Sequence, residues 1–132
     1  MSEIVFSQEY ERRAYDPPMP MLDIGISRPG LNAPSATVEA VVDTGADGTL
    51  IPRDTLERVG AAFVDRAYLR GMTGQRQPVD LYLVTLYLGP LRITGVRAVA
   101  LSPGDITILG RDVLNQLNLA LIGVAGVTEV HR

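Results

Sequence analysis

Short apolar runs recur along most of the chain, and several alternate with polar residues in the period-2 pattern of strands. Between the first two runs, residues 28–35 supply the Pro, Gly and Asn of a loop. Gly89 and Pro90 join two longer β-rich runs and indicate a hairpin. The predicted strands cover residues 21–26, 37–42, 81–88, 91–101, 119–122 and 127–130.

Helical signals are confined to two short segments. Pro52 suits the first turn of one helix, which should stop near Gly60. The second is predicted over residues 111–118, where apolar residues recur at helical spacing. Many short strands with Gly and Pro turns predict an all-β fold, a small barrel or sandwich. We expect an N-terminal arm over residues 1–19 and one folded domain over residues 20–132.

Charge and composition exclude several classes of partner. Net charge is −3, and the 12 basic residues, all arginine, are scattered from Arg12 to Arg132 without a run or stripe. This distribution predicts neither a nucleic-acid partner nor a polybasic membrane segment. Cysteine is absent and the only histidine, His131, lies at the end of the chain, so we expect no metal and no cofactor. No apolar stretch approaches the roughly 20 residues of a membrane span, and a cytoplasmic protein is predicted.

The most informative stretch is an apolar strand that ends in a carboxylate. Val41 and Val42 lead into Asp43, and Thr44 and Gly45 follow. Glycine permits tight backbone geometry and the close approach of a ligand or another chain. Taken alone, Asp-Thr-Gly is also compatible with an ordinary Asx-type turn after a strand.

This stretch resembles the active-site loop of retropepsin-like aspartic proteases, the single-domain enzymes of retroviruses and their bacterial relatives. In that family a hydrophobic pair precedes Asp-Thr/Ser-Gly-Ala and apolar residues follow it, as residues 41–42 and 50–51 do here. Residues 106–114 resemble the strand end and helix that pack beneath the catalytic loop; alone, they would indicate only a strand-to-helix junction. The resemblance spans roughly residues 20–123. It implies a small closed acid-protease-like β-barrel with two short helices.

The resemblance also assigns roles to particular residues. It implies a catalytic loop of Asp43, Thr44 and Gly45. Substrate contacts would come from the loop and from a mobile flap, that is from Ala46, Asp47, Gly71, Met72, Thr73 and Gly74. Gly110 and Arg111 would give structural support, with Arg111 paired to Asp47. A purely structural ion pair is the simpler interpretation of that pairing.

Aspartic proteolysis needs two carboxylates about one water molecule, and this chain has a single Asp-Thr-Gly. We therefore expect one half of a symmetric homodimer, with Asp43 facing its own copy. The terminal segments 4–6 and 127–132 do not match the short terminal strands of the viral enzymes, which leaves the dimer sheet open.

Three functions remain compatible with the sequence. The first is an aspartic endopeptidase acting on peptide or protein substrates. The second is a retropepsin-like module that dimerises or binds peptides without cleaving them. The third is an unrelated β-barrel binding protein with a chance Asp-Thr-Gly.

Overall fold

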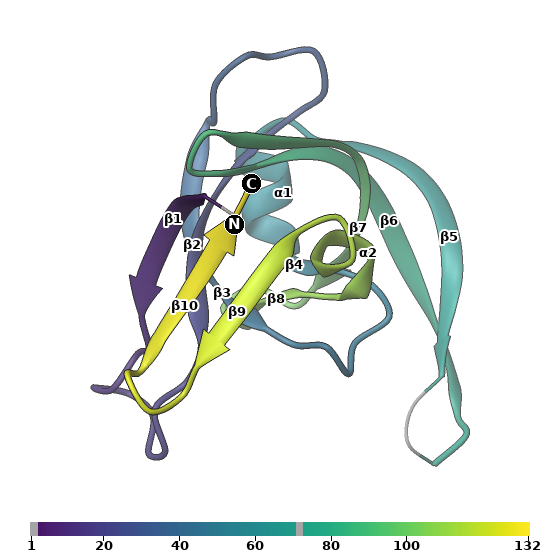
Figure 1. Ribbon diagram of the computed structural model, residues 1–132. Coiled ribbons are helices and arrows are strands. Elements are labelled where there is room, and N and C mark those ends of the chain that lie inside the picture. Colours follow the sequence, from purple (N-terminus) through teal and green to yellow (C-terminus); the bar gives the residue numbers. More distant parts are fainter. Residues whose placement is uncertain (1–2, 71–72) are drawn as a thin grey trace.

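The computed structural model describes residues 3–70 and 73–132, and it is built mainly from strands with two short helices (Figure 1). In chain order the elements are β1 (Ile4–Glu9), β2 (Met21–Ser27), β3 (Ala36–Val42), β4 (Leu50–Pro52), α1 (Arg53–Arg58), β5 (Ala62–Arg70), β6 (Arg76–Leu88), β7 (Leu91–Leu101), β8 (Thr107–Leu109), α2 (Arg111–Leu114), β9 (Asn118–Ile122) and β10 (Val127–His131). All six predicted strands are present, as β2, β3, β6, β7, β9 and β10.

The second helix is shorter than predicted. α2 ends at Leu114, whereas the sequence pattern indicates a helix up to residue 118. The amides of Gln116 and Leu117 bond to carbonyls three residues back, which tightens the chain into turns. Asn118 then begins β9, so the pairing of β9 with β10 ends the helical segment.

Six strands of the described chain close into a barrel. Their order is β2-β3-β8-β4-β7-β6, and β6 pairs back to β2 with Gly25 opposite Tyr87. β5 continues the sheet outward from β6. Closure leaves these six strands without a free edge, and it confirms the predicted all-β fold with two short helices.

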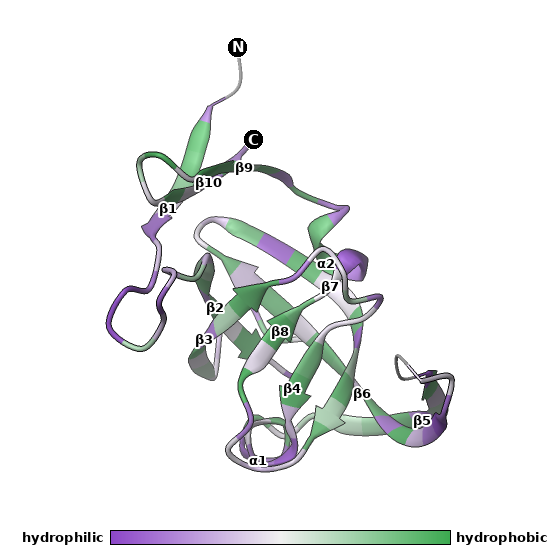
Figure 2. Ribbon diagram, turned by 90° about the horizontal axis from the view of Figure 1, so that it is seen from below, coloured by the Kyte–Doolittle hydropathy of each residue, from purple (hydrophilic) through white to green (hydrophobic). Residues whose placement is uncertain are grey.

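The barrel interior is filled by alternate residues of its strands. Leu22, Ile24 and Ile26 of β2 are fully buried, as the period-2 geometry of a strand requires. Leu56 of α1 and Val113 of α2 join the same core, so both helices pack on the barrel. Figure 2 shows the apolar colouring concentrated on the barrel strands. Among the described residues no helix is long and apolar enough to cross a membrane.

The chain ends form a second, three-stranded sheet of order β1-β10-β9, set apart from the barrel in Figure 2. Residues 4–9, which the sequence placed in the arm, thus form a strand, with Gln8 opposite Thr128. Val130 is fully buried, and Phe6 packs against the same core. This sheet therefore covers one side of the barrel.

Two loops cross in direct backbone contact beside the end of β3. One joins β3 to β4, and the other is the junction of β8 with α2. A Cβ on Gly110 would overlap the backbone of Gly48, so only glycine fits at the crossing. The buried Thr49 closes the contact, because its hydroxyl donates to Asp112 Oδ1 (2.8 Å) and accepts from the Gly110 amide (3.2 Å).

We expect Gly110→Ala to lower the free energy of unfolding by about 2 kcal/mol, because the added methyl forces the two loops apart. Urea unfolding followed by circular dichroism measures the change. Gly123→Ala is the matched control, since its Cβ would meet no atom within 4 Å. Equal stability of the two variants would show that the loop crossing yields without strain.

Candidate active site

Asp43 lies directly after β3 and is held by the neighbouring strand and by its own loop. Its amide donates to Leu109 O of the parallel strand β8 (3.1 Å). The Gly45 amide donates to Asp43 Oδ1 (2.9 Å), and the Ala46 amide donates to Asp43 O (3.2 Å). Within residues 3–70 and 73–132, Oδ2 has no hydrogen-bond partner. The half-buried carboxylate is thus oriented through one oxygen and leaves the other available to a ligand.

The junction of β8 with α2 holds the loop from below. The Arg111 amide donates to Ala46 O (2.8 Å), and the Asp112 amide donates to Asp47 O (3.3 Å). Asp112 also receives the Thr49 amide on Oδ2 (3.2 Å). Gly110 and Arg111, the residues predicted to support the loop, thus lie in the segment that contacts it from below.

Sequence reasoning missed Thr49 and Asp112, which connect the two segments across 63 positions of the chain. Their only local signals are a Thr just before an apolar strand and an Asp in the first turn of a helix. Both are common at element ends, so neither stands out in the sequence.

The pairing of Arg111 with Asp47 is present. One guanidinium nitrogen pairs with Asp47 Oδ1, and the other donates to Thr44 O (2.7 Å). The Asp47 side chain is 89% exposed, so the ion pair itself contributes at most about 1 kcal/mol. Since Arg111 contacts the loop at both Thr44 and Asp47, the arrangement favours the structural interpretation.

The loop presents its tip outward. Thr44 and Gly45 are exposed, and within the described chain the Thr44 hydroxyl has no hydrogen-bond partner. Ala46 is half-buried behind them, and Asp47 is exposed beside them.

The predicted flap coincides with the hairpin of β5 and β6, paired out to Arg70 and Arg76. Thr73 and Gly74 are exposed at its tip, and Gly74 has a φ of +81°. Gly71 and Met72 lie outside the described residues.

Ion pairs hold the base of the hairpin. Asp80 of β6 pairs with Arg53 of α1 (3.2 Å) and with Arg66 of β5 (3.3 Å). The hairpin is therefore attached near its base to α1, while its tip projects freely (Figure 1).

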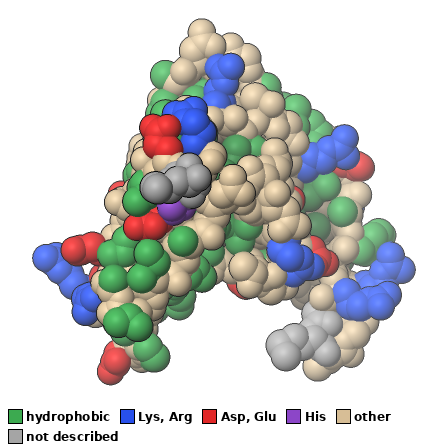
Figure 3. Space-filling view, in the orientation of Figure 1, with side chains coloured by type: hydrophobic (Ala, Val, Ile, Leu, Met, Phe, Trp, Pro, Cys, Tyr) green, Lys and Arg blue, Asp and Glu red, His purple; other side chains and the backbone are tan. Residues whose placement is uncertain are grey.

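The site opens into a hollow between two projections. In Figure 1 the β3–β4 loop lies between the terminal sheet and the β5–β6 hairpin, and Figure 3 shows the surface hollowed between these parts. Outside the two undescribed segments, no group of three or more His, Cys, Asp and Glu residues is arranged to hold a metal ion. The chemistry available at the loop is that of a carboxylate.

The sequence and the fold were compared with those of known proteins, and both show similarities. The family described as "gag-polyprotein putative aspartyl protease" matches residues 32–116. A retropepsin-like aspartic protease from Rickettsia conorii superposes with a TM-score of 0.64 at 13% identity, over 99% of this chain and 94% of that chain. The EIAV protease, solved with the inhibitor HBY-793, superposes with a TM-score of 0.55 at 22% identity, over 74% of this chain and 86% of that chain. Among curated proteins no sequence matches.

The similarity to the two solved structures shows the fold of this chain, and the match to the family model shows the family to which it belongs. The matched segment covers more than half of the chain and contains both the Asp43 loop and the β8–α2 junction that supports it. The protein therefore belongs to the gag-polyprotein putative aspartyl proteases, with the fold of the retropepsin-like aspartic proteases.

Proposed function

We propose that this protein is an aspartic endopeptidase that hydrolyses peptide bonds with a water molecule held between two Asp43 carboxylates, one from each chain of a homodimer. The observation that carries the proposal is the half-buried Asp43 carboxylate, which the Gly45 amide orients and whose Oδ2 has no partner in the described part of the chain. Membership in a family of putative aspartyl proteases supports a catalytic role for this loop.

The chemistry follows from bringing two like charges together. Two carboxylates about 3 Å apart cannot both ionise, so the pair shares one proton. The ionised partner takes a proton from the water, and the protonated partner polarises the peptide carbonyl. Activity should therefore fall once the pH is high enough to remove the shared proton.

The second carboxylate has to come from another chain, because the sequence contains only one Asp-Thr-Gly. Thr44 is exposed, and its hydroxyl has no partner among the described residues, so it would brace the two loops across the symmetry axis. Gly45 would allow the close approach of the second loop.

The terminal sheet supplies a surface for this dimer. β9 forms one edge of the sheet, and it exposes Leu121 (50%) and Ile122 (38%). The opposite edge strand, β1, is tied to β2 because Gln8 receives the Asp23 amide (2.6 Å) and donates to Asp23 Oδ1 (3.3 Å). An uncovered apolar edge invites pairing with another strand. We assign the dimer contact to β9 and its copy.

Substrate would lie in the hollow between the Asp43 loop and the β5–β6 hairpin. Ala46 and Asp47 would contact its backbone from one side. Gly71, Met72, Thr73 and Gly74 would act as the flap from the other side. Such a hairpin tip with glycines can hinge and offer backbone hydrogen bonds.

Asp43→Asn should lower the rate of peptide cleavage by about 10³-fold, because the amide keeps the turn but cannot exchange the proton. Wild type and variant are incubated with a diverse peptide pool at several pH values between roughly 3.5 and 7. This range includes the higher pKa of the carboxylate pair in pepsin, about 4.7. Mass spectrometry identifies the cut sites.

Asp65→Asn, an exposed change on β5, is the control and should cut like wild type. Cuts that persist in Asp43→Asn would exclude Asp43 as the catalytic carboxylate. A folded wild type that binds peptides without cutting any of them would instead favour the non-cleaving module.

Leu121→Arg should convert the dimer to monomer and abolish cleavage, because a charge on the β9 edge opposes strand pairing. Sedimentation equilibrium measures the assembly. Ile4→Arg is matched, because Ile4 is also 50% exposed but lies on the opposite edge strand. If Ile4→Arg rather than Leu121→Arg dissociates the dimer, β1 and not β9 forms the contact.

A further inference from the structure

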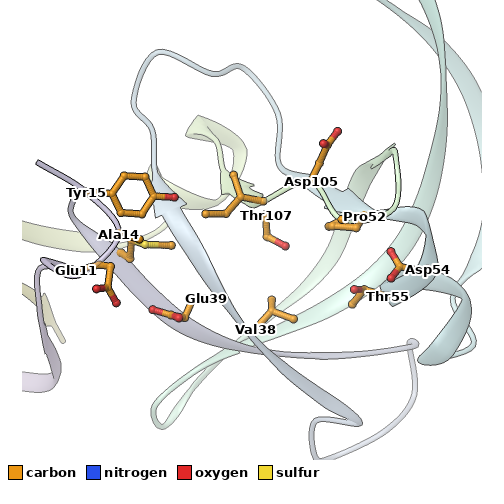
Figure 4. A pocket seen from close by; sticks show the side chains of 13 residues that line it. Glu11, Ala14, Tyr15, Val38, Glu39, Pro52, Asp54, Thr55, Asp105 and Thr107 are labelled. Atoms are coloured by element: carbon orange, nitrogen blue, oxygen red, sulfur yellow. The ribbon is translucent and has the colours of Figure 1, made fainter. Parts of the chain in front are cut away.

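A second hollow, of about 490 Å³, lies on the side of the barrel. Its walls are the segment that precedes β2, strand β3, the start of α1 and the loop that leads into β8 (Figure 4). None of the described residues assigned to the Asp43 site lines it. The cavity is therefore separate from the residues proposed to cleave the peptide.

Each wall contributes one carboxylate, and these are Glu11, Glu39, Asp54 and Asp105. No arginine is among the lining residues, and none of the four carboxylates has an ion-pair partner within residues 3–70 and 73–132. The cavity thus concentrates negative charge that the described chain does not neutralise.

One of these carboxylates is placed at an electrostatic cost. Glu39 of β3 lies directly opposite Asp23 of β2 in the antiparallel pair. Like charges in directly opposite positions destabilise a sheet. A cation bound beside Glu39 would relieve this repulsion.

Two largely buried threonines open their hydroxyls to the cavity. Thr55 and Thr107 are only 6% and 4% exposed, and neither hydroxyl forms a hydrogen bond within the described part of the chain. Neither is among the fully buried side-chain atoms, so each hydroxyl remains accessible from the cavity. Figure 4 shows both side chains on the cavity wall. Polar groups of largely buried residues are normally hydrogen-bonded, so these two hydroxyls are available to a ligand in the cavity that donates N–H groups.

The lining suits an organic cation better than a metal ion. The carboxylates are spread over four walls, and among described residues no three of them converge as metal ligands would. Val38 and Ile106 supply apolar surface between them, and the Tyr15 ring stands at one side (Figure 4). Apolar surface with acidic groups around it accepts an aliphatic stem that carries a charged end, and an aromatic face adds a cation–π contact.

We propose that this cavity binds the side chain of an arginine or lysine in a peptide segment, as a docking site distinct from the Asp43 loop. The guanidinium or ammonium group would contact Glu39 and Asp54 and donate to the two threonine hydroxyls. If the protein cleaves peptides as proposed above, a basic residue outside the cleaved segment would hold the substrate here. The binding itself does not depend on cleavage.

The test is a titration of the 15N-labelled full chain with the peptide acetyl-Ala-Arg-Ala-amide, followed by NMR shifts of the Gly104, Asp105 and Thr107 amides. The peptide with citrulline in place of arginine has nearly the same shape without the charge. Spermidine is titrated separately, as a free cation without a peptide backbone. Added salt should weaken binding, since the contacts are partly exposed ion pairs.

The variant Glu39→Gln/Asp54→Asn should bind the arginine peptide about fivefold more weakly, in line with the loss of two partly exposed charge pairs. Glu9→Gln/Glu57→Gln removes the same charge from exposed positions outside the cavity and should bind like wild type.

Two results would overturn the proposal: no shift of the cavity amides with the arginine peptide, and equal shifts with the citrulline peptide. In the first case, shifts with spermidine would show that the cavity takes free cations and not a peptide side chain. Neither result needs a variant, so the test holds even if the double variant does not fold. Loss of cleavage in Asp43→Asn bears on the proposed function only, because that residue does not line the cavity.

Discussion

The site depends on the crossing of two loops that are far apart in the sequence. Gly110 approaches the backbone of Gly48 closely enough to exclude any side chain, and Thr49 bonds to both Gly110 and Asp112 at the same point. These contacts leave the β3–β4 loop little freedom to move. The direction of the Asp43 carboxylate follows from that restriction, since the Gly45 amide that orients it belongs to the same loop.

The crossing also explains why the barrel and the site form one unit. β8 is only three residues long, yet it pairs with β3 on one side and with β4 on the other. It therefore holds both ends of the loop that carries Asp43, and Leu109 O receives the Asp43 amide. The barrel acts as a rigid support, and the reactive group sits at the end of one of its strands.

The N-terminal segment has two roles in this architecture. Its first part forms β1 and completes the terminal sheet, while the bridge between Glu11 and Met19 turns the chain back toward β2. The turn so formed supplies one wall of the acidic cavity. The same segment thus links the proposed dimer sheet with the proposed docking site.

The sequence by itself determined the strands of alternating pattern, the two helix positions and the Asp43 loop, because each is encoded by neighbouring residues. Alternation and the Gly and Pro turns are local signals, and Asp-Thr-Gly after an apolar strand is a contiguous motif. The strand β1 and the end of α2 were not determined in this way. β1 forms by pairing with β10, and the pairing of β9 with β10 ends the helical segment before it. Only the tertiary structure decided the contact of Thr49 with Asp112, the fit of Gly110 against Gly48 and the gathering of four carboxylates around one cavity. The physical reason is that barrel closure sets these distances, and no short segment of sequence specifies how remote segments will meet.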